Sequence, residues 1–370
     1  MAGRSSLITG GAGFIGANFA HYWAAKHPRD QITVLDALTY AGNLLSLESL
    51  TGLPSYRFTQ GDIRDQQLVE SILRRNNIDT IVHFAAETHV DRSIVDPDAF
   101  IETNIVGTHS LLKAAKTVWL DDFRAPDTHR FHHVSTDEVY GSLTQDAPAF
   151  CEDTRYDPSS PYSASKASSD HLVRAYHRTY GLNVTISNCS NNYGPYQFPE
   201  KLIPLTILSA LEGKRIPVYG DGSNIRDWLY IEDHCRGIEL VLQQGKSGET
   251  YNIGGHNEQR NIDIVETICG TMDKTFETQP NLARRFPHSP AATQDKSASL
   301  IQFVTDRPAH DYRYAINPER ILTHLGYSSQ ESFATGIEKT IAWYLNNESW
   351  WRAVMGGRYR QWISEQYALG

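Results

Sequence analysis

Short apolar runs alternate with amphipathic stretches through the first half of this 370-residue chain, and this alternation constrains the fold more than any other feature. A short apolar run bounded by turn residues has the length of a buried strand, whereas a longer stretch with apolar residues three or four apart favours a helix. Strands that alternate with helices are joined by crossovers, pair in parallel and carry helices on both faces of the sheet. We therefore predict a doubly wound α/β sheet. The expected strands are Ser6–Thr9, Ile32–Asp36, Tyr56–Thr59, Thr80–Phe84, Phe131–Ser135 and Val184–Asn188, and the expected helices include Phe14–Lys26, Gln66–Asn76, Phe100–Thr117 and Tyr162–Tyr180.

The second half of the chain predicts a smaller α/β lobe. After a loop at residues 194–199, the pattern indicates a helix, a short strand, a second helix and a further strand at Lys201–Glu212, Ile216–Tyr219, Ile231–Leu242 and Thr250–Ile253. Trp343, Trp350, Trp351 and Trp362 argue against a disordered tail. The chain is too long for one minimal core, so we expect two interleaved lobes. Residues 1–190 with about 227–256 would form the sheet domain, and about 191–226 with 257–370 the smaller lobe.

Composition narrows the classes of partner. The formal net charge is −9 and no long basic run is present, which argues against nucleic acid or an anionic membrane as the main partner. No apolar stretch approaches the ~18 residues that a membrane span needs, and the first strand begins too early to leave room for a signal peptide. The cysteines, Cys151, Cys189, Cys235 and Cys269, lack metal-ligand or redox spacing, and the histidines show no paired pattern. We expect reduced thiols, no metal site and a cytoplasmic protein.

A glycine-rich turn follows the first expected strand and opens the first helix. Gly10, Gly13 and Gly16 form a Gly-x-x-Gly-x-x-Gly pattern, in which glycine lets the backbone approach a pyrophosphate held on free helix N–H groups. Asp36 ends the second strand, where a carboxylate accepts hydrogen bonds from a ribose diol and repels a 2′-phosphate. This arrangement favours NAD over NADP. The alternative for Asp36 is a capping or turn aspartate.

A tyrosine and a lysine, Tyr162 and Lys166, are spaced to share one face of a helix. Tyrosine acts as a base at neutral pH only if its pKa falls by roughly 3 units, about 4 kcal/mol. A nearby ammonium and a positive nicotinamide ring both favour the phenolate. Such a pair is common on helix surfaces, but it follows a dinucleotide motif here. Together with Ser135 and Thr136, these motifs resemble the extended short-chain dehydrogenase/reductase superfamily, which implies a Rossmann-type fold.

Two adjacent carboxyl groups, Asp137 and Glu138, follow Thr136. Elimination of water beside a ketone needs one neutral acid and one ionised base, and two carboxyls tuned apart by their surroundings can fill these roles. The pKa of Asp137 would have to rise for it to stay protonated, and burial beside anionic Glu138 acts in that direction. The alternative is a carboxylate pair that caps a helix or faces solvent.

These carboxyls and several longer motifs resemble the dTDP-glucose 4,6-dehydratase family from about Ser5 to the C-terminal tryptophans. The motifs are Phe84–Asp91, Asn188–Pro195, Glu200–Pro204, Ile225–Tyr230 and Asp306–Asp311. The resemblance implies that Tyr162 deprotonates the sugar 4-hydroxyl, that Lys166 holds the phenolate, and that a hydride passes from C4 to NAD. Glu138 then removes the C5 proton, Asp137 protonates the departing 6-hydroxyl, and the hydride returns to C6. The product would be the 4-keto-6-deoxy sugar nucleotide used in deoxysugar synthesis, for example of rhamnose.

The same resemblance implies the binding residues. For NAD they are Gly10, Gly13, Phe14, Ile15, Gly16, Asp36, Thr39, Asp62, Ile63, Phe84, Ala85, Ala86, Asn104, Tyr162, Lys166 and Asn192. For dTDP-glucose they are Thr88, Thr136, Asn191, Lys201, Leu202, Pro217, Val218, Tyr219, Arg226, Asn261, Asp306, Arg307 and His310. Arginine can clamp a phosphate with two hydrogen bonds. Arg226 could instead pair with Asp227, and Asn261 could cap a helix beginning near Ile262. The family pattern usually has glycine where Ala309 stands, which puts the geometry of that loop in question.

Three other functions fit parts of the pattern. A nucleotide-sugar 4-epimerase would share NAD and the Tyr162–Lys166 pair but has no use for Asp137 and Glu138. A dehydratase could act on a CDP-, GDP- or UDP-sugar. A dinucleotide-binding sensor would need neither residue pair intact. Helices Phe100–Thr117 and Tyr162–Tyr180 carry broad apolar stripes, and in relatives they pair with their copies, so we expect a homodimer; the alternative is that both faces pack internally.

Overall fold

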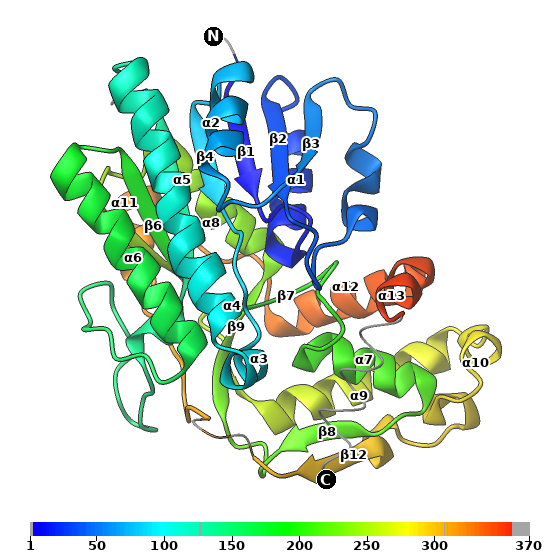
Figure 1. The fold of residues 1–370 in the computed structure, drawn as a ribbon. Coiled ribbons are helices and arrows are strands. Elements are labelled where there is room, and N and C mark those ends of the chain that lie inside the picture. The colour runs from blue at the N-terminus through cyan, green and yellow to red at the C-terminus, as the bar shows by residue number, and fades with distance from the viewer. Residues whose placement is uncertain (1–2, 126–127, 307, 309, 357–370) are drawn as a thin grey trace.

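A seven-stranded sheet in which every neighbouring pair is parallel forms the centre of the computed structural model (Figure 1). The structure describes residues 3–125, 128–306, 308 and 310–356. The strand order is β10-β6-β5-β4-β1-β2-β3. The bounds are β1 Ser5–Thr9, β2 Gln31–Asp36, β3 Tyr56–Gln60, β4 Thr80–His83, β5 Arg130–Thr136, β6 Val184–Cys189 and β10 Thr250–Ile253. The order reverses between β1 and β4, and ligands bind at such a switch point, beyond the carboxyl ends of the strands.

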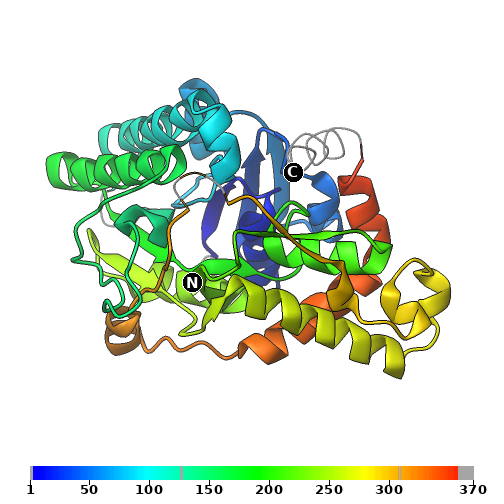
Figure 2. The same ribbon diagram turned by 90° about the horizontal axis from the view of Figure 1, so that it is seen from below.

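Helices cover both faces of this sheet, as the sequence predicts. One layer holds α2 (Gln66–Arg75), α5 (Thr108–Ala115) and α6 (Pro161–Tyr180), with α5 packed between the other two. The opposite layer holds α1 (Phe14–Lys26) and α8 (Ile231–Gln244), which pack on each other. Figure 2 shows α5 and α6 side by side along one flank. Buried strand residues such as Leu7, Ile8 and Ile81 join the sheet to these layers and supply its hydrophobic core.

The helix expected at Phe100–Thr117 is longer than predicted. It begins as α4 (Asp98–Phe100), continues through a π-helical segment at Ile101–Gly107 and α5, and ends in a second π-helical segment at Lys116–Asp122. A short helix, α3 (Val90–Val95), precedes it, and two 3₁₀ turns lie at Leu44–Leu50 and Asp137–Tyr140. The sequence pattern did not predict α3 or the π segments, because each is shorter than the window in which helical periodicity is visible.

The smaller lobe is built on two short sheets. In one, β7 (Asn191–Tyr193) and β11 (Glu258–Arg260) flank β9 (Ile225–Tyr230); in the other, β8 (Ile216–Tyr219) pairs in parallel with β12 (Ile301–Val304). The helices α7 (Leu202–Glu212) and α9 (Asn261–Thr278) pack against each other. The sequence predicted α7 and β8 correctly but missed β7, β9, β11 and β12. Those strands are short or interrupted by charged residues, so their period-2 pattern is weak.

The C-terminal helices contact both parts of the molecule. The shortest, α10 (Leu282–Arg285), and α12 (Phe333–Asn346) lie with the smaller lobe, α11 (Glu319–Leu325) packs on α8 and β10, and α13 (Glu348–Val354) follows α12. Trp350 and Trp351 are buried in α13, and Trp350 donates to the Ser46 hydroxyl at 3.1 Å. Trp362 lies outside the described residues. The two-lobe boundaries stay a prediction, because the C-terminal helices pack on both lobes: α12 packs on α9, and α11 packs on α8.

No helix in the described ranges is long and apolar enough to cross a membrane. Within the same ranges, no cluster of three or more histidine, cysteine or acidic side chains has the geometry of a metal site.

Candidate active site

One cavity of about 340 Å³ opens at the carboxyl ends of β1, β2, β4, β5 and β6. It extends from the glycine-rich turn, past Asp36 and Thr136, to the first turn of α6 and the start of α7. The strand order places the motifs predicted from the sequence around this single space, although they come from distant parts of the chain. This is the location at which a doubly wound sheet binds its ligand.

The glycine-rich turn is closed so tightly that side chains cannot replace two of its glycines. Gly10 has φ +69°, and a Cβ atom there would lie 2.6 Å from both N and Cα of Ala85. A Cβ atom on Gly16 would lie 2.3 Å from the Gly10 carbonyl oxygen. Gly13 caps α1 without a side-chain hydrogen bond, so the first-turn N–H groups, which have no carbonyl partner inside a helix, border the cavity. The turn therefore fits a pyrophosphate.

Asp36 has both the predicted position and the turn-forming role given as its alternative. It ends β2 and borders the cavity, and its carboxylate accepts backbone N–H groups of Ala12 at 2.9 Å and Leu38 at 2.8 Å. Burial raises the pKa of Asp36, and the two N–H donors oppose that rise. A carboxylate has about four lone-pair sites, so two remain for a ribose diol.

The two predicted carboxyl groups stand where β5 ends. Thr136 closes the strand, and its hydroxyl oxygen accepts the Glu138 N–H at 3.3 Å, which starts the 3₁₀ turn Asp137–Tyr140. The turn ends at Gly141, whose φ of +93° brings it against the Asp157 carbonyl oxygen. Asp137 is 2% exposed and Glu138 is half-buried, and both border the cavity. Solvent-facing carboxylates, the alternative given above, are therefore excluded for Asp137.

The surroundings of Asp137 favour its protonated form, as predicted. Burial, followed by the charges of Glu138 and Asp227, raises the pKa of Asp137 well above its usual value, whereas Arg226 acts in the opposite direction. Thr136 contacts Asp137 Oδ1 at 3.3 Å. A neutral carboxylic acid can donate a proton, and a less buried neighbour can stay ionised beside it.

The tyrosine–lysine pair is buried at the start of α6, which rules out the surface alternative. Ser160 caps the helix with a reciprocal Ser160–Ser163 capping box, and Pro161 occupies the first turn. Tyr162 and Lys166 are 7% and 4% exposed, and both border the cavity. The Lys166 ammonium donates to the Val134 carbonyl oxygen at 2.9 Å, and burial lowers its pKa to about 8.

The protein residues around Tyr162 act against its predicted ionisation. Burial raises the pKa of Tyr162 well above its usual value, and the charge of Glu138 adds to that rise; the hydroxyl of Thr136 opposes it. The net shift is therefore opposite to the lowering predicted for Tyr162 beside a charged Lys166 and a nicotinamide ring, and that combined effect stays a prediction. Burial and the charge of Glu138 dominate the pKa of Tyr162, while the Lys166 ammonium donates to the Val134 carbonyl oxygen of β5.

Comparison with known proteins identifies the family. The model of the GDP-mannose 4,6 dehydratase family matches residues 7–340. A dTDP-glucose 4,6-dehydratase of Escherichia coli is 52% identical over 364 residues, covering 95% of this chain and 97% of the relative. The chain belongs to the dTDP-glucose 4,6-dehydratase family.

Two solved structures are also similar, each with a TM-score of 0.82. The dTDP-glucose 4,6-dehydratase of Streptomyces venezuelae, solved with NAD bound, is 45% identical and covers 95% of this chain and all of its own. The Bacillus anthracis enzyme in complex with NAD is 42% identical, with coverage of 95% and 99%.

The residues predicted to bind NAD in this member of the dTDP-glucose 4,6-dehydratase family lie together around the cavity, with one exception. Those that border the cavity are Gly10, Gly13, Phe14, Ile15, Gly16, Asp36, Thr39, Asp62, Ile63, Phe84, Ala85, Ala86, Tyr162, Lys166 and Asn192. Asn104 lies behind the residues that border the cavity. Its side chain accepts the Glu87 N–H at 2.9 Å and donates to the Glu87 carbonyl at 3.0 Å and to Ser165 Oγ at 2.8 Å. It therefore supports the loop after β4 in this structure.

The predicted substrate residues divide into two groups. Thr88, Thr136, Asn191 and Lys201 border the cavity, and the Lys201 ammonium donates to the Thr88 carbonyl oxygen at 3.2 Å. The others, Leu202, Pro217, Val218, Tyr219, Arg226, Asn261, Asp306 and His310, lie on α7, β8, β9, α9 and the 306–311 loop and do not border it. Arg307 and Ala309, the position at which the family pattern usually has glycine, lie outside the described residues.

Arg226 is held in place without the pairing to Asp227 offered as its alternative. Its guanidinium stacks 4.3 Å from the centre of the Tyr314 ring and donates to the carbonyl oxygens of Asp311 at 2.9 Å and Ile225 at 2.7 Å. The Asp227 carboxylate accepts instead the Ser190 hydroxyl and the N–H groups of Gly255 and Asn257. Asn261 is the first residue of α9 and Arg260 is its N-cap, so the capping alternative for Asn261 is wrong.

Sequence reasoning missed several residues that border the cavity: Tyr40, Arg64, Glu87, Cys189, Ser190, Gln197, Phe198 and Glu200. Cys189 and Ser190 end β6 and could have been found from the rule that ligands meet strand carboxyl ends. Tyr40, Phe198 and Glu200 lie on loops that only the folded chain brings together. Glu200 is buried beside the Arg92 guanidinium at 3.2 Å, and this guanidinium stacks 3.9 Å from the Tyr40 ring centre.

Proposed function

We propose that this protein converts dTDP-glucose to dTDP-4-keto-6-deoxyglucose, acting as an NAD-dependent hydro-lyase in deoxysugar synthesis. One observation carries the proposal: a buried acid and a less buried carboxylate stand beside a buried tyrosine–lysine pair and a dinucleotide turn, around one cavity. A 4-epimerase needs the tyrosine–lysine pair but not the two carboxyls. Relatives named as dTDP-glucose 4,6-dehydratases share about half of the sequence over nearly the whole length, which supports the same conclusion.

The cofactor is NAD. The first turn of α1 would hold the pyrophosphate, Asp36 the adenosine ribose, and the residues after β4 the wall beside the nicotinamide. When bound, NAD supplies the acceptor and donor of the hydride and a positive ring that favours a phenolate nearby.

Tyr162 and Lys166 begin the reaction at the sugar 4-hydroxyl. Tyr162 takes the hydroxyl proton as a general base. Its ionisation is opposed by burial and by Glu138, so the opposing positive charges of Lys166 and the cofactor ring are needed. The Val134 carbonyl holds the Lys166 ammonium close to β5, which fixes its direction without neutralising it. Thr136, whose hydroxyl lowers the pKa of Tyr162, lies between this pair and the two carboxyls.

Asp137 and Glu138 carry out the elimination. A ketone at C4 makes the C5 proton acidic, and Glu138 removes it as a base. Asp137, kept protonated by burial and by Glu138, donates its proton to the 6-oxygen, which leaves as water. The alkene left between C5 and C6 must then take up the hydride at C6 and a proton at C5. Glu138, whose proton can exchange with solvent, would return the proton to C5. The proton taken up by Tyr162 must reach Asp137, directly or through solvent, before the next turnover.

The nucleotide end would be bound by the smaller lobe. Arg226 offers a guanidinium already oriented by Tyr314 and three backbone carbonyls, which suits a diphosphate. Lys201 at the start of α7 adds a second positive charge at the cavity wall. We further propose a homodimer in which α5 and α6 pair with their copies. The described cysteines are unpaired, which fits the predicted cytoplasmic location.

Turnover against glucose linked to dTDP, UDP, GDP and CDP tests this proposal. We expect product from dTDP-glucose, with loss of one water measured by mass spectrometry. Preferential turnover of another nucleotide would replace the substrate and keep the chemistry. A product of unchanged mass would contradict the dehydratase assignment, as would a protein with bound NAD that turns over none of the four.

A further inference from the structure

An aspartate on α6 continues the row formed by the tyrosine–lysine pair. Tyr162, Lys166, Asp170 and Arg174 follow one another at four-residue spacing, so they share one face of the helix. Asp170 and Lys166 are 0% and 4% exposed. Asp170 does not border the cavity and was not among the residues predicted from the sequence. A fully buried carboxylate is costly unless it is paired and hydrogen-bonded, so its surroundings need an explanation.

The Asp170 carboxylate accepts hydrogen bonds from two side chains and lies close to a third. Its Oδ2 accepts the Ser135 hydroxyl at 3.0 Å and the Tyr156 hydroxyl at 2.8 Å. Its Oδ1 lies 3.2 Å from Nε2 of His133. His133 and Ser135 are two apart on β5, and alternate residues of a strand face the same side, so both reach α6. Val134 lies between them, and its carbonyl oxygen receives the Lys166 ammonium.

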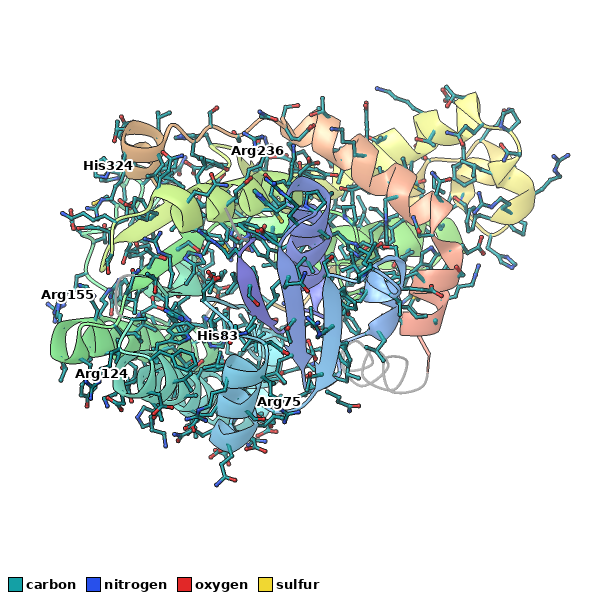
Figure 3. The ribbon with its side chains drawn as sticks, turned by 90° about the horizontal axis from the view of Figure 1, so that it is seen from above. Arg75, His83, Arg124, Arg155, Arg236 and His324 are labelled. Atoms are coloured by element: carbon teal, nitrogen blue, oxygen red, sulfur yellow. The ribbon has the colours of Figure 1, made fainter. Side chains whose placement is uncertain are left out.

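The far side of His133 is closed by a second histidine. The His83 ring packs 5.1 Å from the His133 ring, and its two nitrogens contact the hydroxyls of Thr9 at 2.8 Å and Thr108 at 2.9 Å. Figure 3 shows His83 inside the molecule, whereas Arg124 and Arg155 lie at its edge. Burial lowers the pKa of His133 to about 4 and that of His83 well below its usual value, so both are neutral near pH 7. His133 therefore gives Asp170 a neutral neighbour that adds no charge at this pH.

The charged groups around Asp170 favour its ionised form, so Asp170 is the buried anion next to Lys166. Burial alone would raise the pKa of Asp170, but His133, Lys166 and Arg174 lower it below its usual value. Arg174 is directed to Tyr156 by a 2.7 Å hydrogen bond and stacks 4.9 Å from that ring. Apart from Asp170, the titratable groups facing Lys166 are His83 on β4, His133 on β5 and Cys189 on β6, with Tyr162 one turn before it on α6. Burial raises the pKa of Cys189 to about 12, so that thiol is neutral.

We propose that Asp170 is a positioning residue of the Tyr162–Lys166 pair, whose buried negative charge keeps the Lys166 side chain an ammonium and directed at Val134 and the cavity. This inference rests on the proposed function, because the ammonium is needed to favour the Tyr162 phenolate. Ser135, Tyr156 and His133 in turn hold the carboxylate. A purely structural carboxylate would stabilise the fold without changing the protonation of Lys166, so the two roles can be separated.

The test compares the protonation of Lys166 in the wild type with that in two neutral variants, Asp170→Asn and Asp170→Ser. Trace acetylation with acetic anhydride between pH 6 and 10, read by mass spectrometry of the Lys166 peptide, reports the neutral amine without substrate or turnover; exposed Lys113 serves as internal reference. Removing an adjacent negative charge favours the neutral amine, so we expect its midpoint to fall by about one pH unit or more. Asp170→Glu, which keeps the charge, should stay near the wild-type midpoint.

Activity provides the second measurement. With the ammonium lost at lower pH, kcat of the neutral variants should decline at correspondingly lower pH. It should lie about fivefold below the wild type at pH 8, near the Lys166 pKa of about 8, and about tenfold below it at higher pH, since one pKa unit is a factor of ten. The matched control is Asp233→Asn. Asp233 is also a buried aspartate, but it accepts the N–H groups of Gln330 and Glu331 and the Arg236 side chain. That variant should lose stability without a change in the Lys166 midpoint.

An unchanged Lys166 midpoint in whichever neutral variant folds overturns the proposal, even if activity is lost. A shift of equal size in Asp233→Asn overturns it as well, because the effect would then be general. Failure of the wild type to act on dTDP-glucose refutes the proposed function, whereas the labelling result is unaffected by it.

Discussion

The cofactor end and the nucleotide end of the proposed site are constructed differently. Backbone geometry forms the cofactor end: Gly10 and Gly16 have no space for a side chain, and the first-turn N–H groups of α1 border the cavity. Side chains from two short sheets, with Asp306 and His310, would form the nucleotide end, where Arg226 and Tyr219 lie outside that cavity. The shape of the cofactor end is determined by steric contacts within one sheet domain. The shape of the nucleotide end depends on how the two lobes pack together. Substitutions at the two ends should therefore fail in different ways.

The largest effect is expected between the two ends, at the carboxyl pair. In Asp137→Asn/Glu138→Gln, the acid and the base are both lost while Tyr162 and Lys166 remain. Dehydration should fall by about a hundredfold to ten-thousandfold, the contribution of positioned acid–base groups. The absorbance of the reduced cofactor should still appear in a single turnover. Full dehydration by the double variant would refute the roles given to both residues.

Gly10→Ala should have the next largest effect, and it tests the cofactor end. The new Cβ atom would lie 2.6 Å from the Ala85 backbone, at a φ that disfavours side chains. We expect loss of bound NAD and a destabilisation of about 1–3 kcal/mol or more, measured by cofactor content and thermal unfolding. Gly270→Ala is the control, since nothing lies within 4 Å of that Cβ position inside α9. It should stabilise the protein by about 0.5–1 kcal/mol. Equal NAD content in Gly10→Ala and wild type would contradict the steric account.

Arg226→Gln tests the nucleotide end. The variant removes the guanidinium that Tyr314, Asp311 and Ile225 orient toward the proposed diphosphate. The expected result is a KM for dTDP-glucose raised by about tenfold or more, since a hydrogen bond to a charged group contributes about 1.5–3 kcal/mol. Asp137 should keep its proton in this variant. Arg226 lowers the pKa of that carboxyl, and its removal takes that influence away. Steady-state kinetics distinguish the two roles of this residue. A fall in kcat at unchanged KM would mean that Arg226 acts in the reaction steps and not in binding.

The pH dependence of the wild type should distinguish the tyrosine–lysine pair from both ends. Burial lowers the pKa of Lys166 to about 8, and the reaction needs its protonated form. Activity should therefore be retained below pH 8 and decline above it, while NAD content stays constant. A kcat that rises steadily through pH 9 would contradict the need for the ammonium.

Tyr219→Phe should have the smallest effect. The Tyr219 hydroxyl donates to Asp91 at 3.2 Å, which joins β8 of the smaller lobe to α3 of the larger one. One such hydrogen bond contributes about 0.5–1.5 kcal/mol. We expect a rise in KM of a few fold, measured beside Arg226→Gln, and no change in NAD binding. A loss of NAD from this variant would mean that the two ends are not separable.

The sequence predicted the sheet, the glycine turn and the carboxyl pair because each is encoded locally. Gly10 and Asp36 are separated by one helix, and strand order then brings β5 and α6 to the same edge. The residues that sequence reasoning missed come together only on folding. Glu200 and Tyr40, on two loops, meet Arg92 on α3. Asp170 lies one helical turn after Lys166, and its hydrogen-bond donors Ser135 and Tyr156 come from two other segments. The rise that burial causes in the Tyr162 pKa was also not predicted, since no motif specifies burial.

Turnover of dTDP-glucose in heavy water separates loss of water from epimerisation. In the proposed mechanism, Tyr162 and Lys166 start an oxidation that Asp137 and Glu138 turn into loss of water within one cavity. This mechanism predicts a product that has lost its 6-hydroxyl and carries solvent deuterium at C5, observed by NMR and mass spectrometry. A product that keeps its 6-hydroxyl and holds no deuterium at C5, with only the configuration at C4 changed, would contradict it.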